Sequence, residues 1–339
     1  MAKNKKQTVF ISGIAGFLGS HLAEYMIAEG HKVVGCDSLI GGYLDNVPPE
    51  ADFYQYDCNF HNSMVKITKG VDTVFHAAAT AYEGLSVFSP YLITKNIVDP
   101  TVSLVTAAIA NNCKRFVYCS SMARYGTNAV PFTEDMTPQP QDPYGIAKVC
   151  GEQMVRNLCG VHGMEYVIAV PHNIIGPRQK YDDPYRNVAS IMINLMLQGR
   201  QPIIYGTGEQ KRCFSDVNDV LWCLEQIAFR EDVVGETFNI GPDEEFVTIN
   251  ELAEIISNLL QFNLNPTYLP DRPQEVMLAN CSADKARARL GFTTSTSLRD
   301  SLAAMIDHIR EKKPKAFHYH LDLEIINDKT PKSWFEKLF

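Results

Sequence analysis

The sequence predicts an α/β fold: a doubly wound parallel (Rossmann) sheet with a smaller C-terminal α/β substrate lobe. Apolar runs of strand length alternate with amphipathic helical segments through the first half of the chain. Each run is continuously apolar, which is typical of strands that are buried on both faces of a parallel sheet. A glycine-rich turn follows the first run. Right-handed crossovers between such strands give the doubly wound arrangement.

The elements follow from this rhythm in chain order. Strands are expected at 8–12, 31–37, 51–57, 72–78, 114–120 and 164–170, with helices from the first glycine turn to Glu29, around 89–112 and at about 143–162. Beyond Pro171, turn-rich stretches separate helices expected near 186–199, 216–230 and 248–260. A strand at 236–240 is expected to return to the main sheet. We therefore expect one domain of 1–170 plus about 216–241 around the main sheet, and a smaller lobe of 171–215 plus 242–339.

Composition excludes several classes of protein. With 339 residues, 45% hydrophobic and 21% charged, the chain is a globular protein rather than a disordered or coiled-coil one. The net charge of −8 argues against nucleic-acid and membrane partners. Nine scattered cysteines without a CxxC pair predict reduced thiols, a cytoplasmic location and no metal site. The lysines before the first apolar run imitate a secretory signal, but the regular glycines and the missing cleavage site argue against one.

A dinucleotide site is predicted where the first strand ends. Gly13, Gly16 and Gly19 form a GxxGxxG turn that opens a helix, and backbone N–H groups there can approach a pyrophosphate. Asp37 closes the second strand, 18 residues after Gly19. A carboxylate there accepts hydrogen bonds from ribose hydroxyls and repels a 2′-phosphate, which favours NAD over NADP. The alternative interpretation is that the glycines are simple turn residues and that Asp37 caps a helix.

A candidate catalytic pair lies at the start of the helix expected at 143–162. Tyr144 and Lys148 are four residues apart and share one helix face. A neighbouring ammonium and a positively charged nicotinamide ring would favour the phenolate, which can take a proton from a sugar hydroxyl. Ser120 and Ser121 end the fifth strand, where a hydroxyl can bind the same oxygen.

Together with these motifs, the chain carries HAAA at 76–79, PHNIIGPRQ at 171–179, IYGTGEQKRCF at 204–214 and RPQE at 272–275. In this order they resemble the NAD-dependent nucleotide-sugar epimerase/dehydratase family of the extended short-chain dehydrogenases/reductases. The resemblance extends from Gly13 to about Ile309. It implies an enzyme that binds a nucleotide-diphosphate sugar, a UDP sugar above all, and that forms a homodimer.

The resemblance also assigns residues. It implies a catalytic set of Ser121, Tyr144 and Lys148. Together with the glycine turn, Asp37 and the Tyr144/Lys148 pair described above, the resemblance gives these cofactor residues: Gly13, Gly16, Phe17, Leu18, Gly19, Asp37, Ser38, Asp57, Cys58, Ala77, Ala78, Ala79, Asn96, Tyr144 and Lys148. The implied substrate residues are Ser121, Asn173, Asn187, Val188, Tyr205, Arg212, Arg272 and Glu275. Simpler roles stay open at this point: a helix cap for Asn96, core packing for Tyr205 and surface salt bridges for the arginines.

One departure from the family narrows the reaction. Related dehydratases and decarboxylases carry an acid just after the catalytic Ser/Thr, whereas this chain has Met122 and Ala123, which exchange no protons. We therefore expect an NAD-dependent 4-epimerase of a UDP-hexose, such as UDP-glucose/UDP-galactose or the N-acetyl forms, that oxidises C4 to a 4-keto sugar and re-reduces it on the opposite face. A UDP-glucuronate 4-epimerase, a keto-sugar reductase and a non-catalytic NAD-binding regulator are the alternatives.

Three weaker clues concern the sugar. Ala279 lies where relatives place a larger residue, so a 2-acetamido group has room. For a glucuronate enzyme, Lys180 keeps the expected charge while Asn173 departs from the expected Thr. His172 is expected to pack rather than react, and residues 82–85 either close over the sugar or form an ordinary loop.

The chain from Lys315 onward is longer than the resemblance explains. His318 and His320 alternate as on a strand, without partners at metal-ligand spacing. Trp334, Phe335 and Phe339 are expected to pack on the sheet or at a dimer interface.

Overall fold

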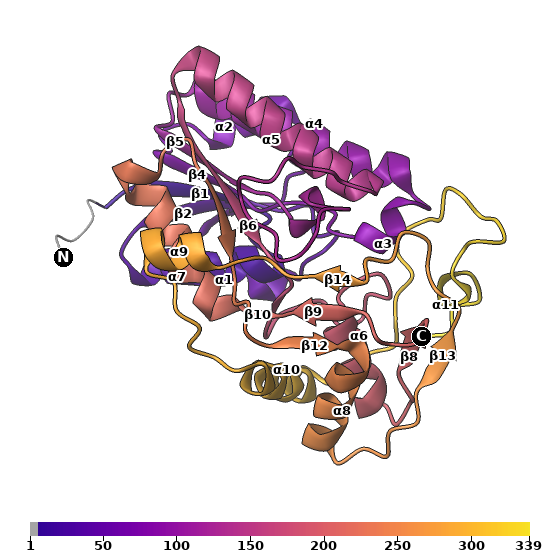
Figure 1. Ribbon diagram of the computed structural model, residues 1–339. Coiled ribbons are helices and arrows are strands. Elements are labelled where there is room, and N and C mark those ends of the chain that lie inside the picture. Colours follow the sequence, from indigo (N-terminus) through magenta and orange to yellow (C-terminus); the bar gives the residue numbers. More distant parts are fainter. Residues whose placement is uncertain (1–5) are drawn as a thin grey trace.

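A computed structural model describes residues 6–339 and contains a seven-stranded parallel sheet (Figure 1). The strand order is β11-β6-β5-β4-β1-β2-β3. The bounds are β1 Thr8–Ser12, β2 Lys32–Cys36, β3 Asp52–Tyr54, β4 Thr73–His76, β5 Arg115–Cys119, β6 Glu165–Pro171 and β11 Thr237–Ile240. The chain order reverses beside β1, so the sheet is doubly wound and the predicted fold class is confirmed. The strand expected at 236–240 does return to this sheet, as its edge beside β6.

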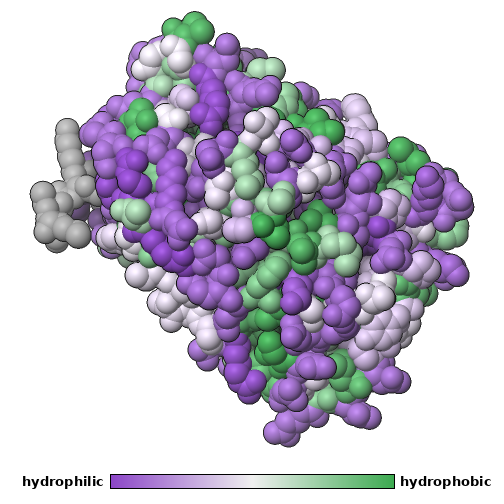
Figure 2. All heavy atoms as spheres, viewed as in Figure 1, coloured by the Kyte–Doolittle hydropathy of each residue, from purple (hydrophilic) through white to green (hydrophobic). Residues whose placement is uncertain are grey.

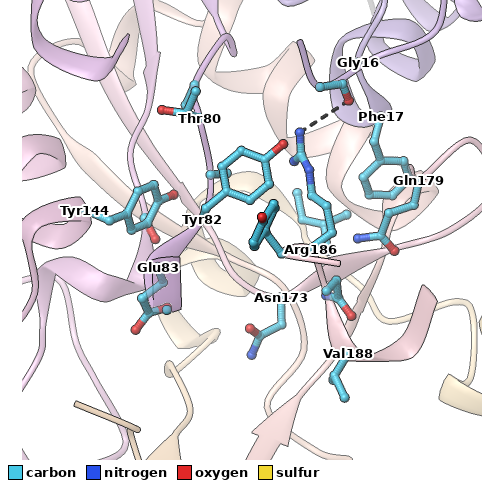
Figure 3. A pocket seen from close by; sticks show the side chains of 18 of the residues that line it. Gly16, Phe17, Thr80, Tyr82, Glu83, Tyr144, Asn173, Gln179, Arg186 and Val188 are labelled. Atoms are coloured by element: carbon cyan, nitrogen blue, oxygen red, sulfur yellow. Dashed lines mark hydrogen bonds between the residues drawn. The ribbon is translucent and has the colours of Figure 1, made fainter. Parts of the chain in front are cut away.

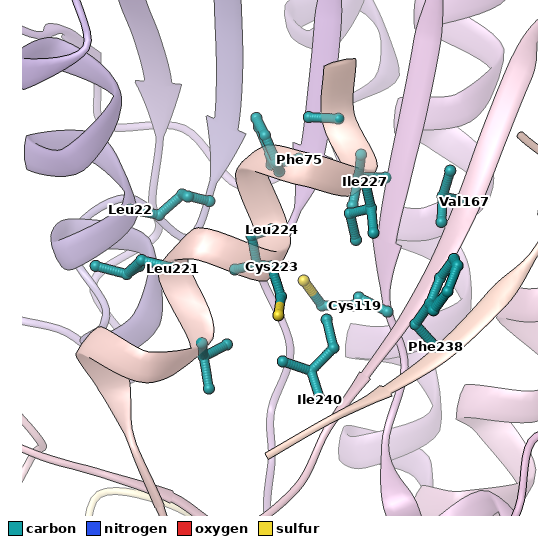
Figure 4. Packing of buried hydrophobic residues seen from close by; sticks show 14 of the residues in the cluster. Leu22, Phe75, Cys119, Val167, Leu221, Cys223, Leu224, Ile227, Phe238 and Ile240 are labelled. Atoms are coloured by element: carbon teal, nitrogen blue, oxygen red, sulfur yellow. The ribbon is translucent and has the colours of Figure 1, made fainter. Parts of the chain in front are cut away.

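Helices cover both faces of the sheet. One face packs against α1 (Phe17–Ala28), α7 (Val217–Phe229) and α9 (Asp284–Leu290). Figure 4 shows α7 lying across this face, with Leu224 and Ile227 among side chains of the strands. The other face packs against α2 (His61–Ile67), α4 (Pro90–Ala110) and α5 (Pro143–His162). α4 is long and apolar enough to cross a membrane by length and composition, but it packs lengthwise along α5.

The second lobe is built from α6 (Val188–Leu197), α8 (Ile249–Leu260) and α10 (Leu298–Lys312), which share a separate apolar core. Small sheets join it to the first lobe. They consist of β7 Ile174–Ile175, β8 Ile203–Tyr205, β9 Lys211–Cys213, β10 Ser215–Asp216, β12 Phe246–Thr248, β13 Thr267–Leu269 and β14 Leu278–Ala279. On the face drawn in Figure 2, apolar side chains gather over the region of β14. The lobe therefore stands over the edge of the main sheet where its strands end.

The segment after α10 differs from the prediction. No strand forms around His318 and His320, and the chain instead runs past α3 (Glu83–Ser86) to α11 (Lys332–Phe335), as the yellow trace in Figure 1 shows. Trp334 is buried, but against α3 and the loop before α6 rather than on the sheet, and Phe335 is exposed. All nine cysteines are free thiols.

Candidate active site

A cavity of about 490 Å³ lies at the carboxyl ends of the parallel strands, between the sheet and the second lobe. This is the edge where open α/β sheets bind ligands, and the volume suits small-molecule and cofactor sites. Every residue that the sequence analysis assigned to the cofactor or the substrate lies on its wall. The structure therefore brings the predicted residues together, while their individual roles stay predictions.

The glycine turn forms a cradle that a dinucleotide diphosphate fits. Gly13 has φ of +75°, and a Cβ there would lie 2.9 Å from the Cα of Ala78. Gly16 begins α1 with no side chain capping the first turn and no acidic residue in it. The N–H groups of that turn are thus available to an anion, which the helix dipole also favours.

Asp37 lies at the opposite edge of this cradle. Its Oδ2 accepts a hydrogen bond from the N–H of Ala15 (3.0 Å) and its Oδ1 one from the N–H of Leu39 (2.7 Å). Burial raises the pKa of the carboxyl group, and these N–H groups oppose that shift. Asp37 therefore joins the glycine turn to the loop after β2, and each of its oxygens keeps a further lone pair for a ribose hydroxyl.

The predicted catalytic set lies on the sheet side of the cavity. Tyr144 projects from the first turn of α5, where Asp142 caps the helix by accepting from the N–H of Gly145 (2.9 Å). One turn further, Lys148 Nζ donates to the Cys119 carbonyl (2.9 Å) and lies 5.9 Å from the Tyr144 ring centroid. The helix thus presents both side chains to the end of β5.

The structure also distinguishes the two serines after β5. The Ser120 hydroxyl donates to the carboxylate of Glu152, which is paired with Arg124 (2.9 Å). Ser121 lines the cavity beside Tyr144 instead, and its hydroxyl lowers the pKa of that phenol. Ser121 is the serine placed to meet a substrate oxygen.

Burial dominates the electrostatics of this set. It raises the pKa of Tyr144 well above its ordinary value and lowers the pKa of Lys148 to about 8. The sequence predicts that Lys148 and a positively charged nicotinamide ring favour the phenolate, whereas the protein around Tyr144 by itself favours the neutral phenol. A positively charged nicotinamide ring in the cavity would oppose the effect of burial.

A cluster of charged side chains occupies the second-lobe side. Glu275 accepts from Arg212 Nη2 (3.0 Å) through Oε1 and from Arg272 Nε (2.9 Å) through Oε2. The Arg272 guanidinium lies 4.6 Å from the centroid of the Tyr205 ring. These arginines face the cavity rather than bulk solvent, and two guanidinium groups sharing one carboxylate leave a net positive charge for an anion.

The positions of Asn96, Lys180 and His172 bear on roles that the sequence left open. Asn96 lies within α4 and accepts from Asn59 Nδ2 (3.3 Å), so it is not a helix cap. Lys180 stacks on the Tyr43 ring (4.3 Å), and it lies 3.4 Å from Asp182 rather than on the cavity wall. His172 is buried and its Nε2 is 2.8 Å from the Pro242 carbonyl, which matches the expected packing role.

Most of the cavity wall lies in a stretch of the chain that matches one known family. Residues 9–241 match the model of the NAD dependent epimerase/dehydratase family. The chain belongs to this family. Its NAD dependence agrees with the uncapped glycine turn and with the position of Asp37 described above.

Individual relatives are similar along almost their entire length. A putative UDP-glucose 4-epimerase from Methanocaldococcus jannaschii is 30% identical, with 89% of this chain and 98% of the relative covered. The structure of Thermotoga maritima UDP-glucose 4-epimerase with UDP-glucose is 29% identical, with a TM-score of 0.84 and coverage of 90% and 99%. A UDP-N-acetylglucosamine 4-epimerase from Methanobrevibacter ruminantium, in complex with UDP-N-acetylmuramic acid, is 28% identical, with a TM-score of 0.84 and coverage of 91% and 100%.

Sequence reasoning missed two charged residues of this epimerase/dehydratase site. Arg186 stacks on the Tyr82 ring (4.6 Å), donates to the Gly41 carbonyl (3.3 Å) and lies 3.5 Å from Asp183. Glu83 belongs to residues 82–85, which were expected either to close over the sugar or to form an ordinary loop. It is the first residue of α3 and faces the cavity below Tyr144 (Figure 3). Neither lies in a recognisable motif, so only the fold reveals them.

Glu83 has an unusual electrostatic environment. Glu83 is exposed to the cavity, yet its enclosure by the surrounding protein and the nearby Asp142 raise its pKa to about 7, while Arg212 and Arg272 oppose the shift. It is therefore an acid that titrates near neutral pH, beside the predicted catalytic tyrosine.

Proposed function

We propose that this protein is a 4-epimerase of a neutral UDP-hexose. The observation that carries the proposal is the placement of Ser121, Tyr144 and Lys148 on one cavity wall, next to Met122 and Ala123 where related dehydratases have an acid. Elimination of water needs a further acid or base on the sugar, and neither Met122 nor Ala123 supplies one. Glu83 also lines this wall, but it projects from α3 and not from the position after the serine. Oxidation and re-reduction at one carbon needs only Ser121, Tyr144 and Lys148.

In this proposal Tyr144 takes the proton of the sugar 4-hydroxyl and later returns it. Ser121 binds the same oxygen and passes the proton along, and Lys148 holds a positive charge beside the phenol ring. NAD, when bound, supplies the acceptor and donor of the C4 hydride. The glycine turn and Asp37 would hold the diphosphate and a ribose of that cofactor in the cavity whose wall also carries Tyr144.

The arginines supply the second requirement of an epimerase. The 4-keto sugar must turn over and present its opposite face, and only the diphosphate can hold it during that turn. Arg212 and Arg272 lie close enough to share Glu275, so together they can bind a dianionic diphosphate in two sugar orientations.

A neutral sugar is favoured by the charges around Tyr144. Among the described residues the cavity wall carries four basic side chains, and each has a partner. Lys148 binds a backbone carbonyl, Arg186 is paired with Asp183, and the other two hold Glu275. Lys180, the base expected for a uronate, lies over the Tyr43 ring and is not among the residues of the cavity wall, whereas Glu83 adds an acid to that wall. Binding a uronate would bring a second carboxylate next to Glu83.

The size of the sugar is less restricted than its charge. Ala279 lines a side cavity of about 30 Å³, together with Glu83, Asp142 and Asn173. A methyl group at this position leaves space beside the sugar, which supports the N-acetyl hexoses along with glucose and galactose.

The experiment is turnover of purified protein with UDP-glucose, UDP-N-acetylglucosamine and UDP-glucuronate, with the epimers resolved by NMR. We expect interconversion of the neutral sugars without added coenzyme, and deuterium at C4 retained in the product. Loss of that deuterium to solvent, or accumulation of stoichiometric NADH, would contradict a 4-epimerase. A preference for UDP-glucuronate would contradict the neutral-sugar part alone.

A further inference from the structure

The segment of residues 313–339, which we call the tail segment, forms part of the cavity wall. Trp334 and Phe339 both line the cavity. The Thermotoga maritima structure is matched along 99% of its length by 90% of this chain, so about a tenth of this chain is additional to it. The family resemblance in sequence also ends near Ile309. The tail segment is thus a part of the site that the family pattern does not explain.

The tail segment is fixed to both lobes across the cavity. On the sheet side, Glu324 accepts hydrogen bonds from the N–H groups of Tyr91 and Leu92 at the start of α4 (2.9 Å each). On the other side, Arg200 Nη2 donates to the Leu338 carbonyl (2.8 Å). Bonds from the middle and from the end of the segment hold it as a strap against both lobes.

Trp334 is the main apolar anchor of this strap. It is 3% exposed, its ring lies edge-on to Phe88 (6.0 Å) and Tyr185 (5.5 Å), and its Nε1 donates to the Pro184 carbonyl (3.1 Å). An indole with its polar N–H satisfied in this way buries a large apolar area at little cost. Its neighbour Phe335 is 59% exposed and is not among the residues of the wall.

Two contacts connect this anchor to the predicted diphosphate site. The Ser333 hydroxyl hydrogen-bonds the Tyr205 hydroxyl, and Tyr205 carries the Arg272 guanidinium on its ring at 4.6 Å. A Cβ on Gly84 would lie 3.2 Å from Arg272 Nη1 and 3.6 Å from Trp334 Cη2. Trp334 and Arg272 thus lie on the same side of Gly84 in α3, so the tail segment helps to set the position of this arginine.

We propose that the tail segment completes the binding site for the nucleotide diphosphate, with Ser333 and Trp334 as positioning residues for Tyr205 and Arg272. This deepens the proposed function, because the ligand is the nucleotide half of the same substrate. The contacts of Ser333 and Trp334 given above lie in the substrate half of the cavity. The tail segment approaches the glycine turn elsewhere, through Lys315, which lies 4.6 Å from the centroid of the Tyr43 ring, and through the Tyr43 N–H, which donates to the Ala15 carbonyl (3.1 Å).

The test compares Trp334→Ala with Phe335→Ala in the full chain. The two positions are adjacent in α11, but only Trp334 reaches the cavity. UDP binding is measured by calorimetry, and retained NAD is measured after denaturation. We expect Trp334→Ala to raise the Kd for UDP at least tenfold with NAD content unchanged, and Phe335→Ala to change neither.

Because a buried tryptophan also stabilises the fold, two milder variants accompany it. Ser333→Ala removes the bond to Tyr205 and should weaken UDP binding severalfold, with the loss appearing in KM more than in kcat. Trp334→Phe keeps an aromatic ring against Gly84 and should recover most of the affinity lost in Trp334→Ala.

The outcomes separate the two proposals. If the wild-type protein binds no UDP, the proposed UDP-hexose substrate is wrong. If the wild-type protein binds UDP, and Ser333→Ala and Trp334→Ala bind UDP equally well, the proposed role of the tail segment is wrong. Parallel loss of NAD and UDP in Trp334→Ala, with no recovery in Trp334→Phe, would also overturn it, because that pattern reports general loss of structure.

Discussion

The two halves of the cavity are built in different ways. The cofactor half consists mostly of backbone and small residues at the ends of neighbouring parallel strands, such as Gly13 after β1 and Ala78 after β4. The substrate half consists of long charged and aromatic side chains from distant segments, such as Tyr205, Arg272 and Trp334. Binding by the first half depends on the fold of the sheet, whereas binding by the second depends on how separate segments pack.

The largest expected effect comes where the two halves meet. Tyr144→Phe removes the proton acceptor but keeps the ring against α5, and we expect turnover to fall about 10³-fold or more. NAD content and UDP affinity should stay near wild type, because neither half loses a binding group. Stopped-flow or coupled assays give kcat, and calorimetry gives the affinity. Turnover within tenfold of wild type would show that Tyr144 is not the acceptor.

The next effect should be confined to the substrate half. Arg272→Ala removes one of the two guanidinium groups and leaves Glu275 paired with Arg212 alone. We expect UDP to bind about 30-fold more weakly or worse, with NAD content unchanged. Arg272→Lys should not restore the affinity, because an ammonium reproduces neither the planar fork nor the stacking on Tyr205. Arg310→Ala, at an exposed position of α10, is the control for a lost positive charge. An unchanged Kd in Arg272→Ala would remove this arginine from the diphosphate site.

A matched glycine pair tests the cofactor half. Gly13 and Gly163 have nearly equal φ angles of +75° and +73°, so a side chain costs backbone strain at both. Only Gly13 lacks space, because its Cβ would meet Ala78, whereas nothing lies within 4 Å of a Cβ at Gly163. We expect Gly13→Ala to lose most of its NAD and to keep its affinity for UDP. Gly163→Ala should lose about 1 kcal/mol of stability and keep both ligands. Retention of NAD by Gly13→Ala would contradict the cradle.

The difference between the two halves of the cavity also explains which elements and residues could be predicted from the sequence. Six of the seven strands of the main sheet and the helices expected at 143–162, 216–230 and 248–260 were predicted within one or two residues of their observed bounds, because a buried parallel sheet leaves continuous apolar runs. The strand expected at 51–57 is shorter and spans Asp52–Tyr54. The glycine turn, Asp37, Tyr144 and Lys148 lie in short local patterns whose geometry follows from the elements that carry them. Their convergence on one cavity follows from strands that all end at one edge.

What the sequence could not predict depends on packing between distant segments. Glu83 lies in residues 82–85, for which the sequence left open a cover over the sugar or an ordinary loop, and Arg186 precedes Asn187 without a motif of its own. The aromatic residues of the tail segment were expected on the sheet or at a dimer interface, but Trp334 lies against α3 and Phe339 on the cavity wall. No periodicity marks where an irregular segment of this length will dock. The position of the Lys180 side chain is likewise set by Tyr43 and Asp182. Tyr43 is distant in the sequence, and Asp182 is only two residues away, so neither contact leaves a sequence pattern.

The smallest expected effect concerns the charge of Glu83, which separates the substrate half from an ordinary anion site. Its pKa rises from the usual 4.5 to about 7 on folding, so between these values the folded protein binds more protons than the unfolded chain. Stability contributed at this position therefore falls as pH rises from 4.5 to 7, and Glu83→Gln should remove that loss. Because the carboxyl group faces the cavity, water screens part of the effect, and we expect the Tm at pH 8 to rise by about 2 °C or less. At pH 4 wild type and Glu83→Gln should have the same Tm, and Glu254→Gln, at an exposed position of α8, is the control variant.

Glu83→Gln should also narrow the preference for neutral sugars by raising the affinity for UDP-glucuronate relative to UDP-glucose. If Glu83→Gln is instead less stable than wild type at pH 8, the charged form of Glu83 stabilises the fold through Arg212 and Arg272, and the argument for a neutral sugar loses its electrostatic support.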